Sequence, residues 1–372
     1  MKKRILCAFL ALCLLLPLSH CGALAETYCG SLDAIKAYLY KQTNLLAGEI
    51  AFSYDPSLEM ILSIQSARNA LLYNAGMVYW RCQIDTQRHV MVIREIQYYQ
   101  GFKIARCSAN GTLNLLGSEE ATVLGKAQAI VEYAMSNYTS QLQRERYFHD
   151  YLCANVTYCR ADYQPGEEGF TLYDTAVGAL QYGTCECDGY SDAFYLLCSL
   201  AGMEVGFQFG RSAERVAANS DETHLWNIIR IGERWYMVDV TWDDLDYADQ
   251  PWMCTYACFN FGNDMGGNHL WDNDLTLHSI ASTGTDFYFY GNPEPGFGGL
   301  AQSLDDAVSY AAQQLRNGNS YVHVMAHSDA SADAFNSSLS NALSNYPRRV
   351  SWQTWASPID SLTAYSILFL SN

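Results

Sequence analysis

The stretch that decides the fold is Gly183–Met203, which reads GTCECDGYSDAFYLLCSLAGM. In its second half apolar residues recur every three or four positions, as they do in a helix with one buried face. Gly202 follows where such a helix would end. The pattern therefore places Cys187 in or beside the first helical turn and leaves Cys185 outside the helix.

A thiol at the start of a helix has a chemical advantage. Free backbone N–H groups and the positive end of the helix dipole stabilise a thiolate there. Cys187 is therefore the better candidate for a reactive thiol. The alternatives are a buried structural thiol at Cys187 or a Cys185–Cys187 disulfide, which would be strained.

The second informative stretch is His224–Asp244, HLWNIIRIGERWYMVDVTWDD. It predicts two strands joined by a two-residue Gly-Glu turn, and that turn sets the register. Asp239 then lies opposite Trp226. Thr241 lies opposite His224. His224 and Asp239 become diagonal neighbours on one sheet face, within joint side-chain reach.

These residue types make a nucleophile, a base and an orienting group. His224 would take the proton of Cys187, and Asp239 would fix the imidazole. The thiolate would attack an amide carbonyl and leave a thioester, which water or a second amine then resolves. The Cys187 backbone N–H is an oxyanion donor, and Tyr173 and Gln181 are the weak candidates for a second one.

The two stretches, together with the tail CFNFGNDMGGNHLWD at Cys258–Asp272, resemble the transglutaminase-like superfamily of bacterial secreted proteins. The shared pattern is Cys-x-Gly-Tyr-[Ala/Ser], then His-x-Trp-Asn, then Trp-Tyr-x-Val-Asp-x-Thr-Trp. The upstream segment FHDYLCANVTY is also similar to the family. The resemblance covers Arg144–Ile280 and does not extend to the rest of the chain.

The resemblance implies an α+β fold with a papain-like core, in which the helix with the cysteine packs on an antiparallel sheet. Carried over by position, it implies Cys187 as nucleophile, His224 as base and Asp239 as orienting group. Cys185 departs from the family, where an apolar residue is more frequent.

An internal comparison organises the rest of the chain. A shift of 272 residues brings Ser31 onto Ser303 and Trp80 onto Trp352. Each end reads as a helix, a strand, a second helix and two strands. We therefore expect two duplicated small α/β units, and we expect them to pack together as one accessory domain.

The resulting division has four parts. Residues 1–25 are a signal peptide, 26–120 an N-terminal repeat unit, 121–290 the catalytic domain and 291–372 a C-terminal repeat unit. The last boundary is placed at the start of the Pro- and Gly-rich segment YGNPEPGFGG, whose composition is typical of a linker.

The N-terminal segment MKKRILCAFLALCLLLPLSHCGALAE predicts cleavage and export. An uncleaved anchor or a lipoprotein through Cys21 are the weaker alternatives. No membrane segment is expected after removal of the signal. The net charge of −17 argues against nucleic acid and anionic membrane as partners. The expected partner is a peptide or protein substrate, which could lie at the cell surface.

No cofactor and no metal are expected. A zinc site from Cys185, Cys187 and a histidine lacks a second pair of ligands. An acidic run could bind calcium but lacks the spacing of a known cage, so a solvated loop is the better interpretation; the run comprises Asp243, Asp244, Asp246 and Asp249.

Other conspicuous side chains have structural interpretations. We expect His149 and Asp150 to brace a helix, and His269 and His278 to be structural or surface residues. We expect buried thiols and packing aromatic residues at four further positions: Cys198, Cys258, Trp226 and Trp242.

The leading functional hypothesis is an exported thiol enzyme that acts on peptide or protein amide bonds by hydrolysis or acyl transfer. The alternative is a catalytically silent module that binds peptides or glycans. The repeat units and the 27 tyrosines and 8 tryptophans motivate that alternative. A third interpretation treats the first repeat unit as a removable pro-segment, and a matching C-terminal unit argues against it.

Overall fold

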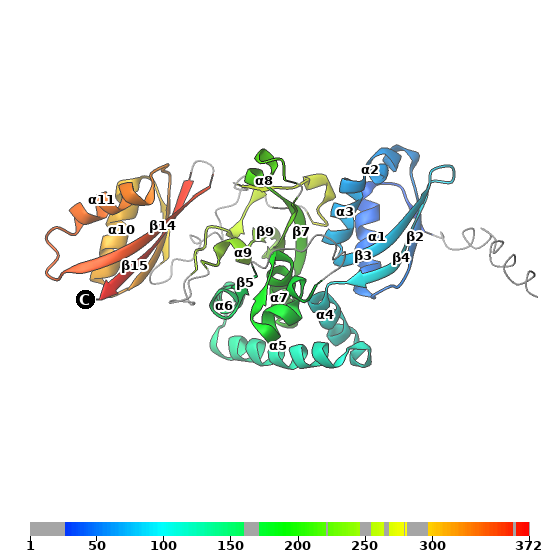
Figure 1. Cartoon of the computed structure of the whole chain (residues 1–372), viewed down its shortest axis with the longest axis horizontal. Helices are drawn as coiled ribbons and strands as arrows, with labels where there is room; N and C mark the ends of the chain where they lie inside the picture. The colour runs from blue at the N-terminus through cyan, green and yellow to red at the C-terminus, as the bar shows by residue number, and fades with distance from the viewer. Residues whose placement is uncertain are drawn as a thin grey trace, which may run out of the picture.

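The computed structural model describes residues 27–159, 171–220, 222–245, 254–263, 268–278, 280, 297–359 and 362–371. Three units follow one another along the longest axis of the molecule, with the central unit between the other two (Figure 1). The predicted signal peptide and most of the Pro- and Gly-rich segment lie outside the described residues.

The N-terminal unit is a four-stranded sheet covered by helices. The strand order is β1-β2-β4-β3, with β1 parallel to β2 and the other pairs antiparallel. The core between the layers contains Ile35, Phe52 and Leu71. The elements are β1 (Tyr28–Cys29), α1 (Leu32–Asn44), β2 (Ile50–Tyr54), the 3₁₀ turn η1 (Pro56–Leu58), α2 (Glu59–Ser63), α3 (Gln65–Asn74), β3 (Met77–Asp85) and β4 (Val90–Tyr98).

The C-terminal unit has a second four-stranded sheet with its own core around Val322, Phe335 and Tyr365. The strand order is β12-β13-β15-β14, with β12 parallel to β13 and the other pairs antiparallel. The elements are β12 (Phe297–Ala301), α10 (Leu304–Arg316), β13 (Tyr321–Ala326), α11 (Ala332–Ala342), β14 (Val350–Ile359) and β15 (Leu362–Ser371).

The two outer sheets therefore share strand order and strand directions. In the N-terminal sheet, Ile50 pairs with Ile93. The 272-residue shift makes Val322 the equivalent of Ile50, and Val322 pairs with Ile367. This partner lies two residues beyond the position that is equivalent to Ile93. Common origin of the units stays a prediction. The expectation that they pack together is wrong, because they lie at opposite ends of the molecule (Figure 1). Each buries its sheet under its own helices, so neither needs the other as a cover.

The central unit packs helices against a five-stranded antiparallel sheet of order β10-β9-β8-β7-β11. The longer elements are α4 (Gln100–Asn110), α5 (Ser118–Asn137), α6 (Gln141–Asn155), α7 (Cys187–Leu200), β7 (Val205–Ser212), β8 (His224–Ile231) and β9 (Arg234–Val238). The shorter ones are η2 (Leu113–Leu115), β5 (Thr157–Tyr158), η3 (Leu172–Asp174), the π-helical η4 (Gly178–Tyr182), β6 (Thr184–Cys185), α8 (Ala213–Ala217), α9 (Val240–Asp243), β10 (Phe259–Phe261), β11 (His269–Leu270) and η6 (Asn273–Leu275).

Helix α7 is the centre of this unit. Ten of its residues are buried, because α4, α5, α6 and β8 all pack around it. The expected helix over this stretch and its packing on an antiparallel sheet are thus found. Helix α4 adds Phe102 and Ile104 to the same core, although the sequence boundary at residue 120 assigned it to the N-terminal unit.

Both outer units contact the central one. Met325 and Leu362 of the C-terminal unit belong to the central core. On the other side, Asn74 donates to the carbonyl of Leu275 (2.9 Å) and accepts from the backbone N–H of Phe209 (2.7 Å). Across the described ranges, none of the helices combines the length and hydropathy that a membrane crossing would need.

Candidate active site

Cys187 is the first residue of α7 and lines a cavity of about 850 Å³. Its side chain is half-buried. Cys185 lies two residues earlier in β6, is fully buried and is not among the residues that line the cavity. Cys187 is therefore accessible from the cavity and Cys185 is not, which agrees with the sequence pattern that favours Cys187 as the reactive thiol.

The residues after Cys187 fix the start of α7. Position 189 must be glycine, because a Cβ there would lie 2.4 Å from the Cys185 Cβ and 2.6 Å from the Tyr173 oxygen. Tyr190 donates its hydroxyl to the Asp244 carboxylate (2.5 Å). The Gly-Tyr pair of the motif thus provides close packing and an anchor for the helix start.

Two further side chains tie α7 to the sheet. Ser191 donates to the carbonyl of Leu225 on β8 (2.9 Å), and Asn227 donates to the carbonyl of Ser191 (3.0 Å). Asp192 accepts three backbone N–H groups, including that of Gly101 at the start of α4 (2.7 Å). These bonds hold the cysteine helix and the histidine strand in fixed register.

His224 and Asp239 meet as the register predicts. Nε2 of His224 lies 2.6 Å from Oδ2 of Asp239, and both residues are buried. The β8–β9 ladder runs from Ile231 opposite Arg234 to Asn227 opposite Val238. The next residue after Val238 is Asp239, so extending the ladder by one residue pair brings β8, which begins with His224, beside the Asp239 carboxylate.

The predicted strand through Trp242 is wrong beyond Val238. The Asp239 carboxylate accepts the backbone N–H of Trp242 (3.2 Å) and so caps the short helix α9. This capping bond ends the strand. Thr241 therefore lies in a helical turn and does not face His224 across a ladder.

His269 is a site residue that the sequence interpretation missed. Its Nε2 lies 2.8 Å from the same Asp239 oxygen that contacts His224. Burial alone would raise the pKa of Asp239, but the two histidines outweigh it and hold that pKa well below its usual range. The tail that resembles the family contains His269, yet no register argument linked it to Asp239.

Aromatic rings pack around the histidine, as expected. Trp242 stacks on the His224 ring with centroids 4.8 Å apart and planes 12° apart. Trp226 is fully buried, and its ring lies 5.6 Å from that of His224. The two tryptophans restrict the imidazole to one orientation.

The surroundings of Cys187 change the acidity of its thiol. Burial raises the pKa of Cys187 well above its ordinary value, and the neighbouring Asp188 adds to the effect, whereas a hydrogen bond from the Leu225 backbone opposes it. Burial therefore opposes the stabilisation that the start of a helix gives to a thiolate.

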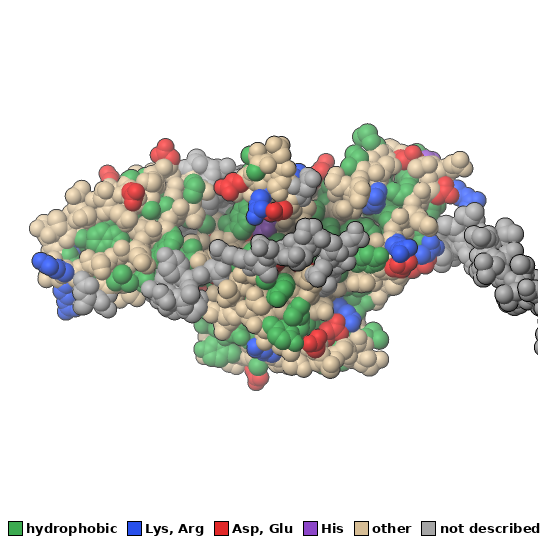
Figure 2. All heavy atoms as spheres, in the orientation of Figure 1, with side chains coloured by type: hydrophobic (Ala, Val, Ile, Leu, Met, Phe, Trp, Pro, Cys, Tyr) green, Lys and Arg blue, Asp and Glu red, His purple; other side chains and the backbone are tan. Residues whose placement is uncertain are grey.

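The cavity has walls from two units. The central unit contributes Cys187, His224 and the charged rim residues Glu214, Arg215 and Glu222, and the C-terminal unit contributes the strand end Ala356, Ser357 and Pro358. In Figure 2 acidic and basic side chains meet beside a histidine in the middle of this face. Neither Tyr173 nor Gln181 is among the lining residues, so neither is supported as an oxyanion donor.

The expectation of a solvated acidic loop is wrong for Asp243. This side chain is fully buried and accepts from the Thr255 hydroxyl (2.7 Å) and the Cys258 backbone N–H (3.0 Å). The chain turns inward at α9, which buries the carboxylate against α6. Asp246 and Asp249 lie outside the described residues.

His149 and Asp150 brace α6, as the sequence predicts. Nδ1 of His149 lies 3.0 Å from Asp150, and Nε2 lies 3.2 Å from Asp243. His278 is also structural, since its ring stacks on Trp235 with centroids 4.0 Å apart.

The ten cysteines in the described ranges are unpaired thiols. Cys198 is fully buried on α7, as expected. Cys258 is only half-buried and lines the cavity, so its thiol is more accessible than predicted.

Comparisons with known proteins concern the central unit. Residues 127–240 match the family model of the transglutaminase-like superfamily. The chain is 24% identical to the Kyphoscoliosis peptidase of Mus musculus over 135 residues and 25% identical to that of Homo sapiens over 140 residues. These matches cover 34% and 35% of this chain, and 19% and 20% of the relatives. The chain thus spans about a fifth of the length of these relatives.

Among solved structures, the crystal structure of a TGase is similar, with a TM-score of 0.29 and 13% identity over 52% of this chain and 50% of that one. The family model and the peptidase relatives support the resemblance seen in the motifs, over this part of the chain. This superfamily includes cysteine peptidases and acyltransferases.

Proposed function

We propose that the protein is an exported thiol enzyme that cleaves or transfers peptide amide groups through a thioester on Cys187. The observation that carries the proposal is the His224–Asp239 contact of 2.6 Å, made by a histidine that lines the same cavity as Cys187. The substrate would be a peptide or protein segment that enters this cavity, and a cell-surface protein is one such substrate.

Each group has one task in the reaction. Because Nε2 of His224 is held by Asp239, Nδ1 would take the proton of the Cys187 thiol. The thiolate attacks the amide carbon, and the Cys187 backbone N–H stabilises the oxyanion. His224 then returns the proton to the leaving amine.

The second half of the cycle decides the product. The thioester on Cys187 is attacked by water or by a second amine, with His224 again as the base. Attack by water gives a free acid and makes the enzyme a peptidase. Attack by an amine gives a new amide and makes it an acyltransferase.

One observation favours the alternative of a silent binding module. Burial and Asp188 raise the pKa of Cys187, and a thiol with a raised pKa forms less of the nucleophilic thiolate. A module that only binds peptides or glycans would use the same cavity walls, including those of the C-terminal unit.

A single experiment separates these functions. Peptide substrates are incubated with the protein, with and without an added primary amine, and the products are analysed by mass spectrometry. A peptidase gives acid products only, and an acyltransferase incorporates the amine. Loss of both products in Cys187→Ala supports the enzyme, whereas peptide binding without turnover in both proteins supports the silent module.

A further inference from the structure

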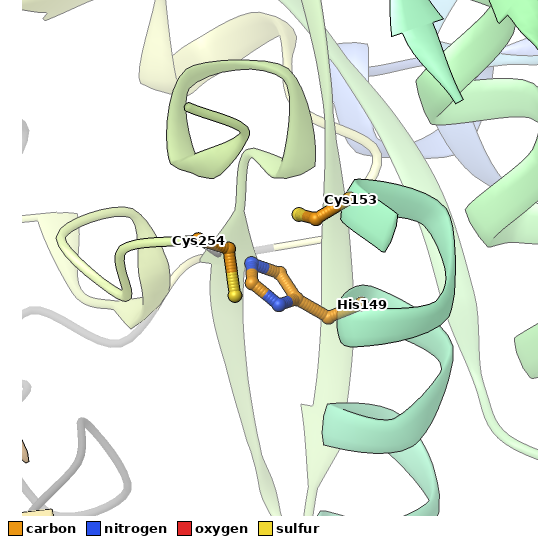
Figure 3. Close-up of side chains that lie close together, drawn as sticks. All are labelled: His149, Cys153 and Cys254. Atoms are coloured by element: carbon orange, nitrogen blue, oxygen red, sulfur yellow. The ribbon is translucent and has the colours of Figure 1, made fainter. Parts of the chain in front are cut away.

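A second group of cysteine and histidine side chains lies outside the proposed active site, and none of its members lines the cavity. We call His149, Cys153 and Cys254 the closed group. One donor atom from each lies within 4.8 Å of the others, and all three residues are buried. Figure 3 shows His149 and Cys153 leaving the same side of α6 toward Cys254, which comes from a separate segment.

The sequence spacing suits a ligand pair. His149 and Cys153 are four positions apart on one helix, so both side chains project from one face, one above the other. Imidazole and thiolate donors favour zinc, whereas calcium and magnesium prefer oxygen ligands.

The histidine is already oriented as a metal ligand would be. Its Nε2 lies 3.2 Å from the fully buried Asp243 carboxylate. Metal-bound histidines usually donate their second ring N–H to such a carboxylate, which fixes the tautomer. Nδ1 of His149, which lies 3.0 Å from the Asp150 carboxylate, would then be left as the zinc ligand.

Asp150 is the candidate for a fourth donor. Its Oδ1 lies 3.0 Å from Nδ1 of His149 and 3.8 Å from the Cys254 sulfur. The Tyr256 hydroxyl donates to the same oxygen (2.7 Å) and would orient it. Together with the closed group, this oxygen would provide the four ligands that a structural zinc site needs.

The two sulfurs belong to the same close group, and each is an unpaired thiol. The thiolate is the form that binds zinc, so zinc binding displaces the thiol protons.

We propose that the closed group binds a Zn²⁺ ion, with Asp150 as the fourth donor. The ion fastens α6 to the segment that precedes β10. This segment also receives the Tyr321 hydroxyl of the C-terminal unit on the Cys254 carbonyl, so the ion braces the contact between these units. This proposal departs from the expectation of no metal. The sequence pattern did not reveal the group, because Cys254 is remote in sequence from the two residues on α6.

The test measures zinc in the purified full chain after dialysis against a weak chelator. We expect about one zinc per chain in the wild type, and less than about a tenth of that in Cys153→Ser and Cys254→Ser. His269→Gln is the matched control, because it removes a histidine from the other His-Asp group near the cavity. This control should retain its zinc.

A second measurement does not depend on the serine variants and so remains informative if one of them does not fold. X-ray absorption at the zinc edge identifies the ligand atoms around zinc in the wild-type protein. We expect two sulfur ligands at about 2.3 Å with nitrogen and oxygen completing the shell. Three outcomes overturn the proposal: no retained zinc, zinc without sulfur ligands, or a Cys153–Cys254 disulfide in non-reducing peptide maps.

Discussion

The central unit contains two groups built from the same residue types, and they differ in access. Cys187 and His224, oriented by Asp239, line the cavity; we call these three residues the open group. The closed group lies in the core, where Cys153 and Cys254 are each 2% exposed. In both groups a buried aspartate orients a histidine.

Composition alone does not assign a role to such a group. In the open group, the sulfur and the imidazole border one cavity, as the proposed reaction requires. In the closed group the sulfurs are buried away from that cavity, so these donors suit the proposed ion and not a substrate. Under the two proposals, access to the cavity separates the catalytic role from the bracing role.

Cys187→Ala gives the largest expected effect on the open group. Turnover of peptide substrates should fall by about 10³-fold or more, because no other group can form the thioester. Product formation is measured by mass spectrometry. Cys258→Ala is the matched control, since this half-buried thiol lines the same cavity, and it should keep turnover within about threefold. Equal losses in both variants would show that the cavity lacks a dedicated nucleophile.

Asp239→Asn should reduce kcat by about 10²–10⁴-fold without unfolding the chain. Asparagine still caps α9 through its side-chain oxygen, but it no longer holds the correct imidazole tautomer. Steady-state kinetics and the thermal unfolding temperature are compared with the wild type. An unchanged kcat would mean that His224 does not depend on this carboxylate.

His269→Gln should have a smaller effect, about a tenfold loss of kcat. His269 acts as a positioning residue, because it contacts Asp239 and not the thiol. Its loss weakens the interactions that hold the Asp239 pKa low, so the acidic limb of the kcat profile should move toward higher pH. A variant with lower kcat and an unmoved pH profile would argue for a packing role only.

Glu145→Gln tests the neighbourhood of the closed group through stability. Burial raises the pKa of Glu145 to about 8, although Asn260 and His149 favour the charged form. Since the folded protein holds this proton more tightly than the unfolded chain, wild-type stability should fall between pH of about 4.5 and 8. The glutamine variant lacks this loss, so its stability relative to the wild type should rise as the pH rises toward 8. Urea unfolding across this range checks the sign, and a pH-independent difference would contradict it.

The sequence predicts the elements that depend on local pattern. The helix at Cys187 and the two-residue turn before Arg234 follow from apolar spacing and turn residues, and the ladder through Val238 follows from that turn. The parity of the hairpin was enough to bring His224 to Asp239. Each of these features is local, because the helix spans Cys187–Leu200 and the hairpin pair His224 and Asp239 lies 15 residues apart.

The rest depends on contacts between remote segments. His269 reaches Asp239 because β11 joins the far edge of the sheet beside β7, which no hairpin argument can supply. Asp243 is buried because capping at Asp239 turns the chain inward against α6. The closed group combines α6 with Cys254 in the same way, so its three members do not form a motif in the sequence.

The central claim is that His224 activates the thiol of Cys187. Its most direct test is the rate of iodoacetamide labelling at each cysteine near neutral pH, followed by peptide mass spectrometry in the wild type and in His224→Ala. We expect Cys187 to react faster than the half-buried Cys159, and we expect its rate to fall about tenfold or more in the variant. Equal rates at the two cysteines, or a Cys187 rate that His224→Ala leaves unchanged, would contradict the account.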